Sequence, residues 1–376
     1  MTFKPKALSM AMVAICSAGS VVAGGADVTL MPTEMMFEKG SYLEVSTVRV
    51  NPNVTSAAVS PTPVAVAPNN SMYSDYSATT LAFKMDLNDK IAVGFADYLS
   101  AGINVDYRND PTIDAFVDLS IRSRLLAVKY QVNENVSILG GWKHSKTSNA
   151  SANVLKNPVG ILTIPSTSDS AFALLAAYEK PEIALRVSGL YQSATKFDLP
   201  MSSSLYGTLL NGKAGLPKSM TVRFQSGIAK NTLIFGSAHR GDWAKSQIEF
   251  ETDNNGAGSV ATPPATDGAI AARSSFTTTT AYTLGLGRKL SEKYAVSATY
   301  GWEKGSGATG SSLLSTTDGK KSLTLGGKYT NGRMTVSAGY SMIRFGDYTN
   351  TTSTTGVNLF SGNTANVIGL KLGFSL

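Results

Sequence analysis

The clearest structural signal in the sequence lies in residues 281–305, AYTLGLGRKLSEKYAVSATYGWEKG, and continues in residues 319–346, GKKSLTLGGKYTNGRMTVSAGYSMIRFG. Within residues 294–303, apolar side chains occupy one parity and small or polar side chains the other, which is the period of a β-strand. The apolar parity begins at Tyr294 and ends at Trp302, eight positions later. This separation is roughly 26 Å along a strand, or about 20 Å of height at a tilt of about 40°. A lipid-facing barrel strand with an aromatic residue at each membrane interface needs such a span.

The following hairpin repeats the alternation. Leu323, Leu325 and Tyr329 share one parity, and the strand ends in the tight turn Thr330-Asn331-Gly332-Arg333. Asn-Gly is typical of a two-residue hairpin turn, because the turn needs residues that tolerate a positive φ. A soluble β-sandwich could contain one such strand, but its aromatic ends would then be accidental. The two hairpins therefore favour a membrane-spanning barrel.

The composition excludes a helical membrane protein. Only 16% of the 376 residues are charged, yet the mean hydropathy is zero. Beyond residue 23 no apolar run approaches the roughly 20 residues that a membrane-spanning helix needs. The formal net charge of +7 is spread along the chain rather than clustered, which argues against a nucleic-acid partner. Any crossing of a membrane must therefore be made by strands.

The first 23 residues have the pattern of a secretory signal peptide. Two lysines precede an apolar core over residues 7–22, and small residues lead to a cleavage position after Ala23. We therefore expect the mature chain to start at Gly24. The single cysteine, Cys16, falls inside the signal, and Ile15 before it argues against lipoprotein cleavage. A mature chain without cysteine can form neither a disulfide nor a thiol metal site.

The mature chain alternates short turns with long connections rich in Ser, Thr, Asn, Gly and Pro. Short turns at one end and long loops at the other are typical of outer-membrane barrels, and an even strand count puts both termini in the periplasm. We therefore predict an all-β fold, a transmembrane antiparallel β-barrel of about 14 strands over residues 41–376, after a short N-terminal hatch segment, 24–40. The predicted location is the Gram-negative outer membrane, crossed many times. The expected strands are at about 41–50, 77–87, 91–100, 119–132, 136–147, 170–180, 183–195, 219–229, 232–245, 278–290, 293–304, 319–330, 333–345 and 365–375.

Basic residues recur on the parity opposite to the apolar side chains. Lys129, Arg186 and Lys328 are examples. A charge on the lipid face would cost about 2–4 kcal/mol at the membrane midplane, so these side chains should face the lumen. They either guide acidic ligands or simply make the lumen polar.

Several sequence blocks, in this order along the chain, resemble the FadL/TodX family of outer-membrane transport proteins. The resemblance implies a fourteen-stranded barrel that passes long-chain fatty acids or other hydrophobic molecules by diffusion. It also implies an N-terminal hatch in the lumen, ligand capture by extracellular loops, and a kink in the third strand that opens the wall sideways. The hatch here is shorter than in the better-known members and lacks their Asn-Pro-Ala motif. The blocks are FEKGSYLEVSTVRVNPNVTS (37–56), AVKYQVNENVSILGG (127–141), YEKPEIALRVSGLYQS (178–193), QSGIAKNTLIFGS (225–237) followed by Asp242-Trp243, GLGRKLSEKYAVSATYGWEK (285–304) and TDGKKSLTLGGKY (317–329).

Two regions supply candidate ligand-binding residues. The hatch segment is rich in methionine, which adapts to varied apolar ligands, although the same side chains could pack the segment against the barrel wall. The third and fourth long loops contain many large apolar residues, as binding surfaces do, although two short loop helices packed together would also explain them. The candidates are Met31, Met35, Met36 and Phe37 in the hatch segment, and Leu155, Ile161, Leu162, Leu205, Leu209 and Leu210 in the loops.

The third predicted strand contains a conflict that marks a candidate lateral gate. Its alternation places Asp97 on the outward parity, where a carboxylate facing lipid is costly. A kink or bulge between Gly94 and Gly102 would interrupt regular pairing there. An early end of the strand is the competing explanation. The candidate gate residues are Gly94, Asp97, Leu99 and Gly102.

No catalytic, metal or cofactor site is predicted. His144 and His239 are the only histidines, and Asp242, three positions after His239, would fall on the opposite face of a strand. There is no His/Cys cluster for a metal. We therefore expect that the protein is not an enzyme and binds no cofactor.

The function predicted from the sequence is a monomeric outer-membrane channel for passive uptake of fatty-acid-like or other hydrophobic small molecules, with membrane lipid as its second partner. The alternative is a general porin for small polar solutes, with a structural or adhesive barrel in reserve. The apolar loops and the methionine-rich hatch favour the first, since a pore for polar solutes would need charged constriction residues.

Overall fold

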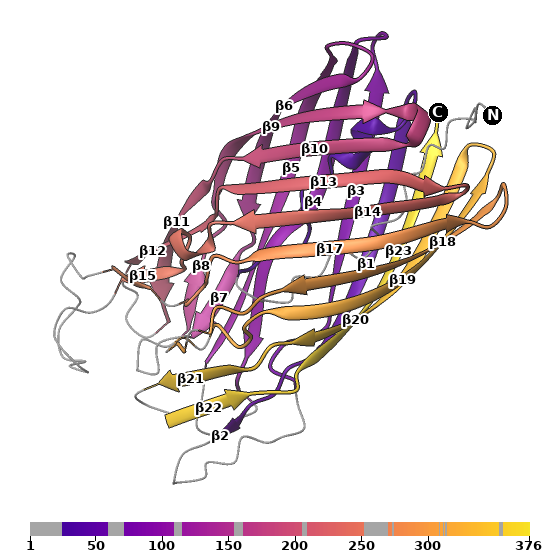
Figure 1. The fold of residues 1–376 in the computed structure, drawn as a ribbon. Helices are drawn as coiled ribbons and strands as arrows, with labels where there is room; N and C mark the ends of the chain where they lie inside the picture. Colours follow the sequence, from indigo (N-terminus) through magenta and orange to yellow (C-terminus); the bar gives the residue numbers. More distant parts are fainter. Residues whose placement is uncertain are drawn as a thin grey trace.

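The computed structural model describes residues 25–58, 71–108, 115–153, 161–204, 209–251, 270–272, 274–307, 309–310, 312 and 314–376 except 353–355. The predicted signal peptide lies outside these residues. Within them, fourteen long antiparallel strands close into one barrel, which confirms the predicted fold class (Figure 1). The strands are β1 (Tyr42–Asn53), β3 (Tyr76–Asp86), β4 (Ile91–Asp106), β5 (Phe116–Gln131), β6 (Val136–Thr147), β9 (Ser168–Lys180), β10 (Leu185–Gln192), β13 (Ser219–Ala229), β14 (Thr232–Gly241), β17 (Thr280–Lys289), β18 (Tyr294–Glu303), β19 (Lys320–Asn331), β20 (Met334–Phe345) and β23 (Thr364–Ser375).

The first and last strands close the barrel. β1 pairs with β23 along its whole length, from Tyr42 opposite Ser375 to Asn53 opposite Thr364. On its other side β1 pairs with β3, and each later barrel strand pairs with the next. The C-terminus lies at the end of the barrel that carries the short turns (Figure 1).

The outer surface of the barrel is apolar, with aromatic residues in two rows. Tyr130, Tyr178 and Tyr294 lie near the short turns, and all are more than 40% exposed. A second row, further from the short turns, contains Trp142, Phe172, Tyr191, Tyr282, Trp302 and Tyr340. An apolar exterior between two aromatic girdles is the surface of a transmembrane barrel, because lipid rather than water covers it.

Nine further strands in the described part of the chain extend the wall beyond the barrel at the end opposite the short turns (Figure 1). Six of them join the main sheet, whereas β2, β21 and β22 form a small separate sheet. Regions predicted as loops thus contain extended structure, and the described parts of the third and fourth loops contain strands instead of the helices considered above. The nine are β2 (Ala57–Ala58), β7 (Ala150–Asn153), β8 (Leu162–Ile164), β11 (Thr195–Ser203), β12 (Leu209–Leu216), β15 (Glu249–Glu251), β16 (Ile270–Ala272), β21 (Tyr348–Thr352) and β22 (Gly356–Phe360).

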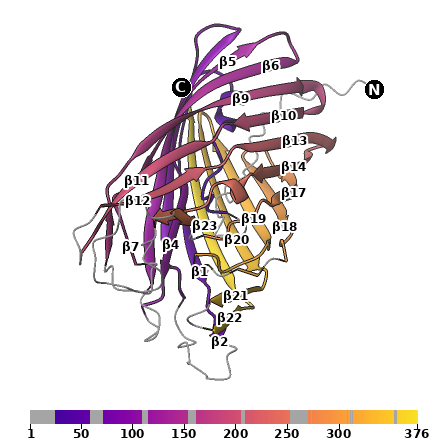
Figure 2. The same cartoon turned by 90° about the vertical axis from the view of Figure 1, so that its left-hand side faces the viewer.

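The N-terminal segment, residues 25–40, lies inside the ring of strands and includes the 3₁₀ helix η1 (Glu34–Phe37) (Figure 2). The other described helices are η2 (Pro181–Ile183), in a turn between strands, and η3 (Trp243–Lys245), after β14. None of the helices in the described part of the chain is long and apolar enough to cross a membrane.

Candidate functional site

The N-terminal segment is held against one side of the lumen by its methionines. Met31, Met35 and Met36 are at most 2% exposed and form a cluster with inward side chains of β3, β4, β5, β6, β9 and β10. Most of these wall residues are alanine or leucine, and the alanines leave room for the methionines. At Gly94, an added Cβ would lie 2.2 Å from Met36 Sδ. In this conformation the methionines pack the segment against the wall and present no free surface to a ligand.

Charged side chains of the wall bind the same segment. Arg186 donates a hydrogen bond to the Glu34 carboxylate at 2.8 Å, and Arg223 Nε lies 3.7 Å from the other carboxylate oxygen. The Phe37 ring has the guanidinium of Arg186 at 4.2 Å and the ammonium of Lys129 at 4.7 Å from its centroid. Lys129 and Arg186 therefore face the lumen, as the parity of their strands predicts, and their partner is the hatch segment.

A further acidic residue of the segment, Glu38, lies among basic side chains near the short turns. Burial raises the pKa of Glu38, while the nearby charges of Lys328 and Lys371 oppose the rise. Lys84 donates hydrogen bonds to the backbone carbonyls of Glu38 and Gly40 at 2.9 and 2.8 Å. The segment is thus fixed by charge at both ends of η1.

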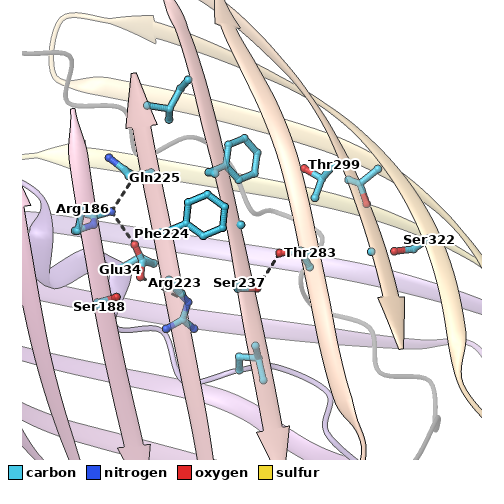
Figure 3. Close-up of a pocket in the computed structure, with 16 residues that line it drawn as sticks. Glu34, Arg186, Ser188, Arg223, Phe224, Gln225, Ser237, Thr283, Thr299 and Ser322 are labelled. Atoms are coloured by element: carbon cyan, nitrogen blue, oxygen red, sulfur yellow. Dashed lines mark hydrogen bonds and ion pairs between the residues drawn. The ribbon is translucent and has the colours of Figure 1, made fainter. Parts of the chain in front are cut away.

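Beside the segment, a cavity of about 130 Å³ occupies the other side of the lumen (Figure 3). Strands β14, β17, β18 and β19 line it with hydroxyl side chains, while Glu34 and the two arginines close its near side. On this wall the small hydroxyl residues leave the space open. On the opposite wall, the methionines of the N-terminal segment cover the alanine and leucine side chains. The hydroxyl side chains are Ser237, Thr283, Thr299, Ser322 and Thr324.

The start of the described N-terminal segment is fastened to η3. The Trp243 indole N–H donates to the Asp27 carboxylate at 2.8 Å, and His239 Nε2 lies 3.5 Å from the same oxygen. Burial by itself would raise the pKa of Asp27, but the hydrogen bond and charge of His239, with the bond from Trp243, outweigh it and hold the pKa below its usual range. His239, considered above as a catalytic group, therefore has the hatch segment as its partner.

This contact predicts an acid-sensitive anchor. Because the pKa of Asp27 is lowered in the folded protein, its stabilisation of the docked segment is complete above about pH 4 and is lost as the pH falls through the lowered pKa. Near-ultraviolet circular dichroism of Trp243, in a W142F/W302F background, should change over this range. Asp27→Asn should show no such transition, and an unchanged parent signal down to pH 2 would contradict the prediction.

The wall has a seam between β3 and β4. Their ladder runs from Asp86–Ala92 to Thr80–Tyr98 and stops, whereas β4 continues to Asp106 with β5 as its ladder partner. The register of β4 against β5 shifts between Leu99 and Ala101, which is a β-bulge at Ser100. Both Ser100 and Ala101 are buried, so the inward parity of β4 changes at this point.

The N-terminal segment covers the free edge of β4 at the seam. Val28 N–H donates to the Ser100 carbonyl at 2.9 Å, and Gly102 N–H donates to the Ala26 carbonyl at 3.0 Å. The hatch segment therefore occupies hydrogen-bonding positions that β3 leaves open.

The four predicted gate residues lie on both sides of the point where the β3–β4 ladder ends. Leu99 and Gly102 border the seam, whereas Gly94 and Asp97 lie in the fully paired part of β4. The predicted interruption is present, and the alternative of an early strand end is wrong, because pairing with β5 continues to Asp106. Ser100, at the centre of the bulge, was not predicted.

The carboxylate of Asp97 faces outward, as its parity predicts. Ion pairs with two arginines offset the free-energy cost of placing this charge on the outer wall. Arg124 Nε lies 3.0 Å from one carboxylate oxygen, and Arg122 contacts the other. The two arginines stand opposite Asp97 and Leu99 on β5. Their role is readable from the sequence only once this register is known.

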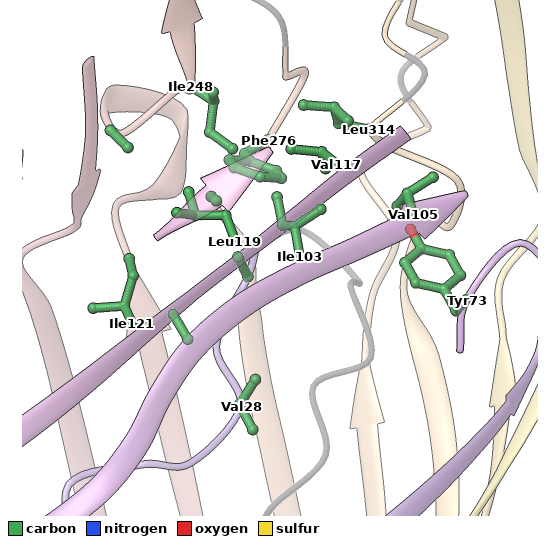
Figure 4. Close-up of a cluster of buried hydrophobic side chains, with 14 of the residues drawn as sticks. Val28, Tyr73, Ile103, Val105, Val117, Leu119, Ile121, Ile248, Phe276 and Leu314 are labelled. Atoms are coloured by element: carbon green, nitrogen blue, oxygen red, sulfur yellow. The ribbon is translucent and has the colours of Figure 1, made fainter. Parts of the chain in front are cut away.

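Beyond the seam, the end of the lumen away from the short turns contains a large apolar cluster (Figure 4). Ile103 and Val105 of β4 meet Leu119 of β5 and residues from several extension strands. Leu162 is 1% exposed within the cluster, while Ile161 is 47% exposed beside it. Leu209 and Leu210 stand in β12, and Leu155 and Leu205 lie outside the described residues. Cluster members that were not predicted include Ile103, Val117, Phe197, Phe250 and Phe276.

The same architecture occurs in a solved FadL homologue and in two solved toluene transporters. A Pseudomonas aeruginosa FadL homologue superposes with a TM-score of 0.69 at 11% identity, covering 92% of each chain. The Pseudomonas putida toluene transporter TodX gives 0.60 at 12% identity, with 92% of each chain covered. The Ralstonia pickettii toluene transporter TbuX gives 0.57 at 13% identity, covering 93% of this chain and 95% of its own. The chain has the FadL/TodX fold.

No family model and no curated protein matches the sequence. At identities of 11 to 13%, the likeness establishes the FadL/TodX fold and no more. The fold expected from the sequence resemblance is therefore confirmed. No cluster of three or more His, Cys, Asp or Glu side chains able to hold a metal is found in the part of the chain that the structure describes.

Proposed function

We propose that the protein is a Gram-negative outer-membrane channel for the passive uptake of hydrophobic small molecules, which leave it sideways into the membrane. The observation that carries the proposal is the seam, where β4 runs on past Tyr98 without β3. A fully hydrogen-bonded wall has no gap for an alkyl chain or an aromatic ring, and unpaired backbone groups facing lipid are costly. TodX and TbuX, which share the fold, are described as toluene transporters.

The proposed path starts in the apolar cluster away from the short turns, where Ile161 and Leu162 lie at the entrance. It continues along Val28 of the N-terminal segment to the bulge at Ser100. A bound hydrophobe replaces the contacts of the segment, and the segment then releases the edge of β4. Met31, Met35, Met36 and Phe37 contact the ligand only after this movement, because they are packed in the present conformation.

Lateral exit has a clear driving force. Burying each CH₂ group in the bilayer contributes roughly 0.8 kcal/mol, which passage straight into the periplasm would forfeit. A fatty-acid-like chain therefore gains most by leaving at the end of the seam nearest the short turns, beside Tyr98 and Leu99, where the wall enters the apolar part of the membrane. A long-chain fatty acid is therefore the first substrate to test.

A general porin remains the second candidate, because one side of the lumen is lined by hydroxyl groups. The cavity beside the hatch segment offers hydroxyl groups that a path for small solutes could use, whereas Leu30, Phe224, Leu233 and Phe235 make other parts of its lining apolar. Glu34 of the docked segment, with Arg186 and Arg223, closes the near side of this cavity, so a path through the barrel would need the segment to leave.

Purified protein reconstituted in liposomes should separate the two functions. We expect faster entry of a long-chain fatty acid, read by an internal pH or binding probe, with nearly unchanged sugar permeability. The apolar entrance and the packed hatch segment are the physical reason. Rapid swelling in small sugars with no effect on fatty-acid entry would replace the proposal by the porin.

A further inference from the structure

The outer wall carries a group of basic side chains near the seam, here called the basic patch: Arg122 and Arg124 on β5, and His144 and Lys146 on β6. In the register of the two strands, Arg122 stands opposite Lys146 and Arg124 stands opposite His144. The side chains of Arg122 and Arg124 are 47% and 66% exposed, and Lys146 is also exposed. All four lie on the outward parity, so they face the surroundings of the barrel rather than the lumen.

The patch lies just beyond the second aromatic row. Trp142, in that row, stacks on His144 with ring centroids 5.5 Å apart. Tyr130, in the row near the short turns, is eight positions from Arg122, or roughly 26 Å along the strand and about 20 Å in height. Charged side chains cost about 2–4 kcal/mol at the midplane but only about 0–1 near the interface. The patch is therefore at the level of lipid headgroups.

The patch has more positive than negative charge. Like charges directly opposite each other on neighbouring strands repel, as Arg122 and Lys146 do. Among the described residues, Asp97 is the one carboxylate that forms an ion pair with the patch, and it contacts both arginines. Lys146 has no ion-pair partner among the described residues, and the exposed Asp118 is four positions further along β5 from Arg122. An external anion would relieve this repulsion.

The arrangement recurs on another part of the wall. Lys321 on β19 stands opposite Arg344 on β20, and both are exposed. Lys321 also stands opposite Trp302 of the second aromatic row. Neither of these cations has a carboxylate partner in the described part of the chain. Two separate pairs of like charges thus occur on the outer wall near the second aromatic row. Their recurrence indicates that the surroundings of the barrel at this level stabilise positive charge.

We propose that the basic patch binds the phosphate group of an anionic lipid in the leaflet away from the periplasm. Guanidinium groups form paired hydrogen bonds with phosphate oxygens, and Lys146 adds a point charge. Each basic side chain near an anionic membrane surface contributes roughly fivefold in binding. Because Leu99 at the seam stands opposite Arg122, the bound headgroup lies beside the seam. The site does not depend on what the channel transports.

Fluorescence of Trp142 tests the site. In a W302F background, Trp142 is the lipid-facing tryptophan of the three in the chain, since Trp243 is only 5% exposed. In phosphatidylcholine bilayers, chain-brominated phosphatidic acid should quench Trp142 at roughly 25-fold lower mole fraction than chain-brominated phosphatidylcholine, about fivefold for each of Arg122 and Lys146. The R122Q/K146Q variant keeps Arg124 on Asp97 and should bring this preference close to one. Lys146→Gln alone should lower it by roughly fivefold, and it leaves no carboxylate without a partner.

The matched control is Arg49→Gln. Arg49 is also exposed on the outer wall, but Asp75 lies 3.2 Å from it, so this substitution should leave the lipid preference of Trp142 unchanged. Folding of each variant is checked by its faster migration on gels before boiling. Equal quenching by the two lipids in the parent, or an unchanged preference in K146Q and R122Q/K146Q, would overturn the proposal.

Discussion

A disulfide between cysteines introduced at Thr79 and Leu99 is expected to reduce hydrophobe transport to the rate of protein-free vesicles. These positions are the next step of the β3–β4 register beyond Thr80 and Tyr98, where the ladder stops. The bond would join the two strands at the base of the seam, and a closed wall leaves no gap toward lipid. The predicted mature chain contains no other cysteine, so the bond can form between these two positions alone.

The matched control joins Phe83 to Phe95, which are already paired in the same two strands. This bond should leave transport unchanged, which separates closing the seam from stiffening the wall. Reduction of the Thr79–Leu99 bond should restore transport. Undiminished uptake by a barrel verified as cross-linked would rule out the lateral route and leave an axial path past the N-terminal segment.

Replacing Gly94 with valine should release the N-terminal segment from the wall. The added Cβ would lie 2.2 Å from Met36 Sδ and 3.1 Å from Met35 Cε. β4 is held here by ladders on both sides, so the segment rather than the strand must move. Overpacking of this kind costs about 1–3 kcal/mol, enough to shift a docked segment without unfolding a barrel. Ion conductance in planar bilayers should rise, and Met36 should become open to peroxide oxidation.

Gly102→Val is the control on the same strand. Its Cβ would have its nearest neighbour at 3.4 Å, so the N-terminal segment should stay docked and the conductance low. A Gly94→Val barrel with parental conductance and a protected Met36 would show that the wall yields instead. Gly94 was predicted as a gate residue from the sequence; in the structure, Met36 packs in the space left by its missing side chain.

The barrel strands were predictable because each separates two environments. From Tyr294 to Trp302, the lipid side requires apolar side chains on one parity and the lumen accepts small or polar side chains on the other. This alternation can be read from the strand's own sequence, without knowing which strands lie beside it. The inward position of Lys129 and Arg186 follows from the same rule. The rule does not predict which groups these cations contact in the lumen. The structure shows that their partners are Glu34 and Phe37 of the hatch segment.

The seam was predictable only in part. Asp97 on the lipid-facing parity indicated an irregularity in the strand. The point at which β3 stops pairing with β4 depends on the register of the two strands, and the sequence of one strand does not determine that register. The strands of the third and fourth loops were missed for a different reason. Phe197, Leu199 and Met201 alternate and are buried, yet Pro200 stands among them and is usually a sign against a regular strand.

The pairing of β1 with β23 has a consequence for the biogenesis of the barrel. Val45 stands opposite Leu372, so the closing contact joins the two ends of the folded chain. β23 follows every other barrel strand in the sequence, and the ring therefore cannot close before β23 has been made. Until then both strands expose a full row of unpaired backbone groups, which would pair with other chains unless a chaperone or an insertion machine shields them. Closure also joins strands that are more than 300 residues apart in the sequence, from Tyr42 opposite Ser375 to Asn53 opposite Thr364, and for such contacts the entropy of loop closure makes folding slow.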